Sequence, residues 1–126
     1  MAKGRVLIVD DHEIDRRLSS LDLEEAGYIC SEAGNVEEAL KRLERQTFDV
    51  IVLDIKMPGV DGLTFLRNMR MVSKLENTPV IMLTASDDMD DELQAMSGGA
   101  VSYLIKPSHR EVLVKEVSAA LEKSRG

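Results

Sequence analysis

Residues 50–62 read Val-Ile-Val-Leu-Asp-Ile-Lys-Met-Pro-Gly-Val-Asp-Gly, an apolar run followed by a carboxylate and then by turn-forming residues. The run at 50–53 is uninterrupted and rich in β-branched residues, which is typical of a strand buried on both faces of a parallel sheet. Pro58 and Gly59 then prevent a continued strand or helix. Asp54 is therefore expected at the carboxyl end of a central strand, where open α/β sheets place their ligands.

A second acidic site follows another apolar run. Residues 5–9 are interpreted as the first strand, and Asp10 and Asp11 come directly after it. If the two strands are parallel neighbours, three carboxylates converge at one edge of the sheet. Like charges this close raise one another's pKa unless a cation neutralises them, and hard oxygen ligands suit Mg²⁺. The alternative is that Asp54 only starts a turn and that Asp11 is only a helix N-cap.

Strand-like apolar runs alternate with helical periodicity five times along the chain. This alternation is typical of βαβ units and predicts an α/β fold with a parallel sheet. The expected strands are residues 5–9, 28–32, 50–53, 80–84 and 101–105. The expected buried rows of the five helices are Ile14, Leu18 and Leu21; Val36, Ala39, Leu40 and Leu43; Leu66 and Met69; Met89, Leu93 and Met96; and Leu113, Val117, Ala120 and Leu121.

Helix starts are marked by capping residues. Asn35 with Glu38, and Ser108 with Glu111, have capping-box spacing. The acidic residues at 87–91 are expected in the first turn of the fourth helix, where the unpaired backbone N–H groups favour negative charge. That helix has only a thin apolar row, so we expect it to be a mobile element.

Size and composition restrict the function further. The 126 residues fit one domain, residues 1–126, with 44% hydrophobic and 31% charged residues as in an ordinary globular protein. The net charge of −7 opposes direct binding to a nucleic-acid backbone. No stretch approaches the ~20 apolar residues of a membrane helix, and no signal-peptide core is present, so a cytoplasmic protein is expected. The single cysteine, Cys30, is expected as a buried thiol.

A family resemblance rests on motifs far apart in the chain: Asp10-Asp11, Asp54 with Met57-Pro58-Gly59 behind it, Thr84-Ala85 and Lys106-Pro107. In this order they resemble the receiver domain of two-component response regulators, of the chemotaxis-regulator type, over nearly the whole chain. The resemblance implies a flavodoxin-like (βα)5 fold, a doubly wound five-stranded parallel sheet with strand order 2-1-3-4-5.

The resemblance also implies a reaction. Asp54 would accept a phosphoryl group as a nucleophile, and cations would stabilise the charge of the transition state. Asp11, Asp54 and the backbone carbonyl of Lys56 would bind Mg²⁺ directly, and Asp10 would bind it through water. Lys106 would bring its ammonium to the phosphoryl oxygens.

Two further residues would report phosphorylation. Thr84 would donate its hydroxyl to the phosphoryl group, and Tyr103 matches an aromatic switch position whose ring moves inward in response. The expected result is a population shift of the surface around the fourth helix, the fifth strand and the fifth helix. Taken singly, Thr84 could be a plain strand residue, Lys106 a surface lysine and Tyr103 a half-buried tyrosine. Pro107 is a candidate for a cis peptide.

The implied partners are a histidine kinase or a histidine phosphotransfer protein as donor, and a downstream protein target or fused effector domain. The protein would be a monomer or a phosphorylation-dependent dimer. It would be a signalling domain that catalyses only its own phosphorylation and autodephosphorylation. A metal ligand or a phosphohistidine is the alternative interpretation of His12, but His12 and His109 are interpreted as surface residues at helix starts, because neither has the spacing of a zinc site.

Three other classes of protein are alternatives to a receiver domain. A haloacid-dehalogenase-type phosphatase needs a second Asp two residues after the nucleophile, where this chain has Lys56. A flavodoxin needs a phosphate loop after the first strand, where residues 10–13 are acidic instead. A phosphorylation-independent receiver-like interaction module stays open as the alternative. Lys56 and Ser86 depart from the commonest receiver pattern, and we expect them to tune the lifetime of the phosphoryl group.

Overall fold

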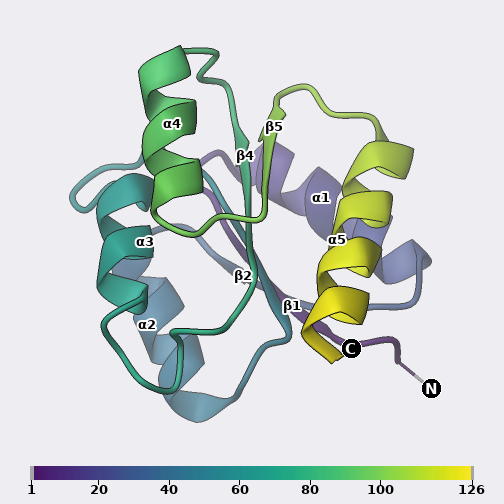
Figure 1. Cartoon of the computed structure of the whole chain (residues 1–126). Coiled ribbons are helices and arrows are strands. Elements are labelled where there is room, and N and C mark those ends of the chain that lie inside the picture. Colours follow the sequence, from purple (N-terminus) through teal and green to yellow (C-terminus); the bar gives the residue numbers. More distant parts are fainter. Residues whose placement is uncertain (1, 126) are drawn as a thin grey trace.

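The computed structural model describes residues 2–125, which form a parallel sheet between two layers of helices (Figure 1). Strands and helices alternate along the chain, which confirms the predicted α/β class. The elements are β1 (Arg5–Val9), α1 (Glu13–Glu25), β2 (Ile29–Ala33), α2 (Val36–Arg45), β3 (Val50–Leu53), α3 (Gly62–Met69), β4 (Val80–Thr84), α4 (Met89–Ser97), β5 (Ser102–Ile105) and α5 (Arg110–Arg125).

The strand order is β2-β1-β3-β4-β5, and all neighbouring strands are parallel. This order confirms the predicted flavodoxin-like, doubly wound sheet. The order reverses between β1 and β3, where such sheets bind ligands beyond the carboxyl ends of the strands. Val9 pairs with Leu53, so Asp10 and Asp54 leave the sheet side by side.

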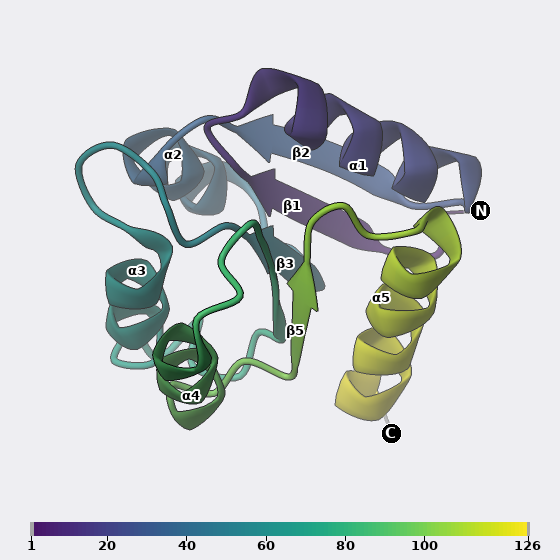
Figure 2. The same ribbon diagram turned by 90° about the horizontal axis from the view of Figure 1, so that it is seen from above.

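Helices cover both faces of the sheet. Helices α1 and α5 lie on one face, and α2, α3 and α4 lie on the other (Figure 2). Almost all residues of β1, β3 and β4 are buried, as expected for central strands of a parallel sheet. Alternate residues of one strand therefore enter different cores: Val6 and Ile8 pack under α5, whereas Leu7 and Val9 pack under α2 and α3.

The predicted buried row of α1 is wrong. Ile14, Leu18 and Leu21 are 75%, 55% and 55% exposed. The helix instead buries Leu23 and two small polar residues, Ser19 and Ser20. Small side chains let a helix lie close to its neighbours. The buried Ser20 hydroxyl donates a hydrogen bond to the Glu24 carboxylate at 2.9 Å, so it is not left unsatisfied.

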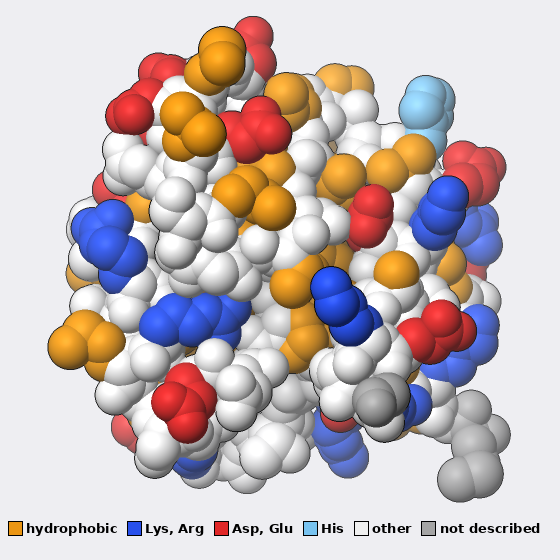
Figure 3. Space-filling model, in the orientation of Figure 1, with side chains coloured by type: hydrophobic (Ala, Val, Ile, Leu, Met, Phe, Trp, Pro, Cys, Tyr) orange, Lys and Arg blue, Asp and Glu red, His pale blue; other side chains and the backbone are white. Residues whose placement is uncertain are grey.

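The predicted row of α4 is also wrong, and that of α2 is partly so. Met89, Leu93 and Met96 are exposed, and α4 buries Ala95 alone. Figure 3 shows hydrophobic and acidic side chains together over this helix. In α2, Leu40 is exposed while the rest of the predicted row is buried. The rows predicted for α3 and α5 are confirmed.

The caps agree with the sequence at one helix and disagree at another. The Asn35 side chain accepts from the Glu38 N–H at 2.8 Å, and the Glu38 carboxylate accepts from the Gly34 N–H at 2.8 Å. The Ser108 capping box is wrong, because α5 begins at Arg110 and the Ser108 hydroxyl donates to the His109 carbonyl. Within residues 2–125, no helix combines the length and apolar character needed to cross a bilayer.

Candidate functional site

Three carboxylates meet where β1 and β3 end. The backbone N–H of Asp54 donates to the Val9 carbonyl at 3.0 Å, which fixes the end of β3 against β1. Asp54 and Asp10 are only 2% and 4% exposed. Asp11 is half-buried beside them. The structure therefore brings Asp10, Asp11 and Asp54 together at the edge of the sheet where the sequence places them.

Lys106 reaches this cluster from the end of β5. Its Nζ lies 2.7 Å from Asp10 Oδ2, 3.2 Å from Asp54 Oδ2 and 3.2 Å from Asp15 Oδ2. Its backbone N–H donates to the Thr84 carbonyl at 2.8 Å, so β4 holds the residue in place. The Lys106–Pro107 peptide is cis, as the sequence suggested.

Burial and charge shift the pKa values in opposite ways. Burial raises the pKa of the Asp10 carboxyl, and the hydrogen bond from Lys106 offsets only part of this effect. Burial opposes the charge of Lys106, but its hydrogen bond to Asp10 and the charge of Asp54 outweigh that opposition and raise the pKa of the ammonium. Lys106 is therefore a cation at neutral pH, and the carboxylates around it still outnumber it.

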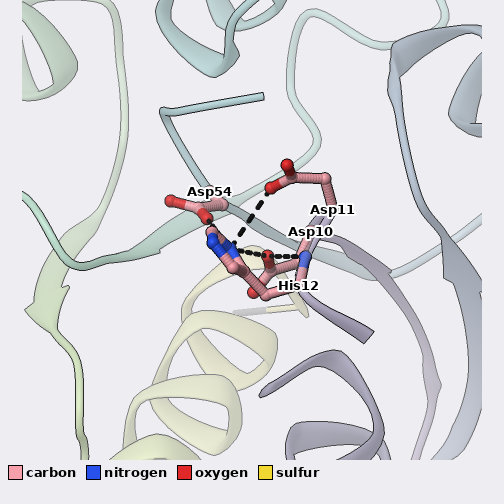
Figure 4. A group of neighbouring side chains, drawn as sticks. All are labelled: Asp10, Asp11, His12 and Asp54. Atoms are coloured by element: carbon pink, nitrogen blue, oxygen red, sulfur yellow. Dashed lines mark hydrogen bonds and ion pairs between the residues drawn. The ribbon is translucent and has the colours of Figure 1, made fainter. Parts of the chain in front are cut away.

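His12 joins the cluster, which the sequence did not predict. Its side chain is 57% exposed, but Nδ1 lies 3.2 Å from Asp10 Oδ1 and 3.2 Å from Asp11 Oδ1 (Figure 4). The distance from Nδ1 to Asp54 Oδ2 is 3.7 Å. The hydrogen bond with Asp10 and the charge of Asp11 raise the pKa of the imidazole. His12 is exposed at the start of α1 as expected, but its contacts with the carboxylates were not predicted.

The donor set fits a divalent cation. One ligand atom each from Asp10, Asp11, His12 and Asp54 lies within 4.8 Å of the other three. Within the described chain, Asp11 Oδ1 is the one buried side-chain oxygen or nitrogen that has no hydrogen-bond partner. A buried, unpaired carboxylate oxygen costs free energy, and a bound cation would satisfy it. Carboxylate oxygens are the ligands that Mg²⁺ prefers.

Thr84 ends β4, Tyr103 lies in β5, and Ser86 joins the two side chains. The Ser86 N–H donates to Thr84 Oγ1 at 3.3 Å, and the Tyr103 hydroxyl donates to the Ser86 carbonyl at 3.0 Å. The Ser86 hydroxyl in turn donates to Asp91 of α4 at 2.6 Å. In the described part of the chain, neither Thr84 nor Tyr103 hydrogen-bonds to Asp54 directly. Ser86 thus links the end of β4, β5 and the first turn of α4.

The loop after Asp54 is packed tightly against α3. The Gly62 N–H donates to the Ile55 carbonyl at 2.8 Å. A Cβ at Gly62 would collide with the backbone carbonyl of Asp54. The Asp54 carboxylate also accepts from the Ile55 N–H at 2.7 Å. Lys56 follows with an exposed side chain, and the role of its carbonyl stays a prediction.

Sequence patterns did not mark two of the charged residues that contact this cluster. Asp15 lies in the first turn of α1, and its contact with Lys106 depends on the direction of that turn. No pattern marks His12 either, because its ring direction depends on the backbone where α1 begins. The contacts of Ser86 likewise depend on a loop conformation that spacing does not predict.

The comparison with known families decides the identity of the fold. The family model of the response regulator receiver domain matches residues 6–118. The chain belongs to the response regulator receiver family. This receiver is similar to the transcriptional regulatory protein ResD of Bacillus subtilis, with 37% identity over 121 residues that cover 95% of this chain and 49% of ResD. It spans about half the length of the curated regulators it matches.

Solved structures agree with the receiver fold. A putative response regulator from Chloroflexus aurantiacus superposes with a TM-score of 0.90 at 33% identity, covering 94% of this chain and 98% of that one. The chemotaxis protein CheY4 of Vibrio cholerae gives a TM-score of 0.87 at 36% identity, covering 96% and 99%. The predicted receiver family and its two-component signalling class are thus confirmed.

Proposed function

We propose that this receiver accepts a phosphoryl group on Asp54 in a Mg²⁺-dependent reaction. The observation that supports it best is the buried Asp54 carboxylate, which has the Lys106 ammonium at 3.2 Å and two further carboxylates beside it. An Asp54 oxygen would attack phosphorus as the bond from phosphorus to the donor breaks, which leaves an aspartyl phosphate and a free donor group.

The residues around Asp54 would divide the work of positioning and charge neutralisation. Asp11, Asp54 and the Lys56 carbonyl would hold Mg²⁺, with Asp10 acting through water, and the ion would neutralise charge on the transferred group. Lys106 would move its hydrogen bonds from the carboxylates to the phosphoryl oxygens. Because this ammonium is already within hydrogen-bond distance of Asp54, only a small movement is needed.

Thr84 and Tyr103 would pass the change to the surface. The Thr84 hydroxyl would donate a hydrogen bond to the phosphoryl group. It would lose the hydrogen bond that it now accepts from the Ser86 N–H. Because Tyr103 and Asp91 also bind Ser86, the loop and α4 would respond together. The α4–β5–α5 surface would then shift toward a form that binds its target.

Receiver domains are signalling domains rather than classical enzymes, and their work depends on partners. We infer that the donor is a phosphohistidine of a kinase or phosphotransfer protein in the cytoplasm. Residues 1–126 would act as one receiver domain. This domain would regulate a separate target protein or a fused effector domain by contacting it. The relatives support this range, since they include transcriptional regulatory proteins and a Vibrio cholerae sensor kinase/phosphatase.

The test is incubation with acetyl phosphate and Mg²⁺ followed by intact mass measurement. The wild type should gain the mass of one phosphoryl group, and Asp54→Asn or addition of a chelator should prevent the gain. A wild type that stays unmodified would favour the alternative, a phosphorylation-independent interaction module. Equal modification of Asp54→Asn would place the acceptor at another residue.

A further inference from the structure

The proposed phosphoryl transfer leaves the imidazole of His12 without a role, yet its Nδ1 faces the carboxylate cluster (Figure 4). We propose that His12 is a nitrogen ligand that lets this site bind a transition metal of the Zn²⁺ and Co²⁺ type in place of Mg²⁺. The inference rests on the proposed function only because both use the carboxylates of Asp10, Asp11 and Asp54.

The distances fit a small tetrahedral site. With metal–ligand bonds of about 2.0–2.1 Å, the ligand atoms of a tetrahedral zinc site lie about 3.3 Å from one another. Nδ1 of His12 lies 3.2 Å from both Asp10 Oδ1 and Asp11 Oδ1, and 3.7 Å from Asp54 Oδ2. All four ligand atoms lie within 4.8 Å of one another, so side-chain rotations would bring them around one ion.

A second observation separates this arrangement from a simple ion pair. Asp11 Oδ1 is buried and accepts no hydrogen bond from the described chain, although His12 Nδ1 is 3.2 Å away. The imidazole bonds to Asp10 and leaves this neighbouring oxygen unsatisfied. An ion between the ring and the two carboxylates would satisfy all three groups. Lys106 contacts Asp10 through the other oxygen, Oδ2, which leaves Asp10 Oδ1 to the ion. It also contacts Oδ2 of Asp54 at 3.2 Å, so the ion would compete with the Lys106 ammonium for that one oxygen.

The ligand types determine which metals would gain from His12. Imidazole suits zinc, copper and nickel, whereas Mg²⁺ prefers oxygen ligands and keeps several waters. Four protein ligands on a tetrahedral ion leave no open position, so a phosphoryl oxygen could not bind it. Zn²⁺ held by His12 would therefore block phosphorylation of Asp54, and the receiver would be inhibited by such metals.

The direct test is calorimetric titration of the wild type and His12→Gln with Zn²⁺ alone and with Mg²⁺ alone. Mutation of a residue that only hydrogen-bonds a metal ligand already costs about 10–100-fold in affinity, so loss of a ligand should lower the preference for Zn²⁺ over Mg²⁺ by at least about tenfold. His109→Gln is the matched control, since it removes the only other histidine of the chain, and it should leave that preference unchanged.

Co²⁺ gives a readout that does not depend on activity. The wild type should show the strong visible absorption of four-coordinate Co²⁺, and His12→Gln should lose it. An unchanged preference or an unchanged Co²⁺ spectrum in His12→Gln would overturn the proposal. An equal loss in His109→Gln would also overturn it, because the metal would then bind elsewhere.

A phosphorylation assay separates this inference from the proposed function. Zn²⁺ should inhibit the Mg²⁺-dependent reaction of the wild type with acetyl phosphate, and half-inhibition of His12→Gln should need at least about tenfold more Zn²⁺. If the wild type is phosphorylated but Zn²⁺ inhibits both proteins equally, this inference fails and the proposed function stands. If the wild type is never phosphorylated but binds Zn²⁺ through His12, the proposed function fails and this inference stands.

Discussion

One ammonium is shared by three carboxylates at the centre of this site. Lys106 contacts Asp10, Asp15 and Asp54, and Asp11 adds a fourth negative charge beside them. Like charges held together in a buried site disfavour ionisation. Without a bound metal, the negative charge exceeds what Lys106 can balance, so part of the stability of the folded state is lost here.

Asp10 is the residue at which this cost should be measurable. Burial raises the pKa of Asp10 in the folded state above the ordinary value of 3.8. Protonation of Asp10 therefore favours the folded state over the unfolded state, and this contribution is fully present below pH 3.8. The contribution is lost as the pH rises through the raised value. Asp10→Asn should therefore increase the free energy of unfolding at pH 7, because the amide does not carry the charge that burial disfavours.

Urea unfolding without divalent metal measures this effect. The gain should disappear below pH 3.8, where Asp10 is protonated in both states. Asp87→Asn is the control, because it makes the same charge change at an exposed position outside the cluster. A less stable Asp10→Asn at pH 7 would show that the bonds of Asp10 to Lys106 and His12 outweigh its burial.

At the scale of elements, the start of α3 determines where Asp54 sits. Gly62 packs against the backbone of Asp54, so a methyl group there must displace either the helix or Asp54. Gly59, in the same loop, is required for another reason. Its φ of +79° is left-handed, but nothing lies within 4 Å of the position its Cβ would take.

These two glycines give a matched pair of variants. Gly62→Ala should lower the free energy of unfolding by about 1–3 kcal/mol, the usual cost of overpacking, and should also slow phosphorylation because Asp54 is displaced. Gly59→Ala should cost about 1–2 kcal/mol of backbone strain with a much smaller effect on phosphorylation. Urea unfolding and the acetyl phosphate rate measure the two effects. Equal rates for both variants would contradict a positioning role for Gly62.

Elements were easier to predict from the sequence than the faces they bury. The strands and the rows of α3 and α5 follow from large apolar residues at regular spacing, whereas the strand order follows from the family resemblance. The row of α1 does not, because Ser19 and Ser20 face the interior while Leu18 faces solvent. Periodicity ranks residues by hydrophobicity, so it misses a helix whose buried side is small and polar. The buried face of α4 was mispredicted for the same reason, because its buried residue is the small Ala95 and not a large apolar residue.

The site shows the same division between what spacing predicts and what it does not. Asp10, Asp54 and Lys106 could be predicted to meet because each follows a strand of one parallel sheet, so topology alone places them. His12 and Asp15 lie beyond the end of β1: His12 directly precedes α1, and Asp15 lies in its first turn. Their contacts depend on the direction of that turn, which the sequence pattern leaves open.

At the scale of the whole molecule, the two edges of the sheet differ in chemistry. The carboxyl edge carries the crowded acids, whereas at the opposite edge Arg70 donates to the carbonyls of Thr78 and Gly99 and holds the loops before β4 and β5 together. A bound cation would therefore neutralise excess negative charge at the carboxyl edge. At the opposite edge, Arg70 of the chain itself provides the hydrogen bonds to the loop carbonyls. Cation binding at one edge should therefore stabilise the entire cooperative fold.

Mg²⁺ should raise the free energy of unfolding by the amount that linkage requires. A ligand that binds only the folded state stabilises it by about 2.7 kcal/mol at 100 times its dissociation constant. Urea unfolding followed by circular dichroism suits the measurement, because the chain has no tryptophan. Asp11→Asn should lose most of the response, since Asp11 Oδ1 is the oxygen that a cation would satisfy. NaCl at matched ionic strength controls for screening, and an equal response to NaCl and Mg²⁺ would contradict a specific site.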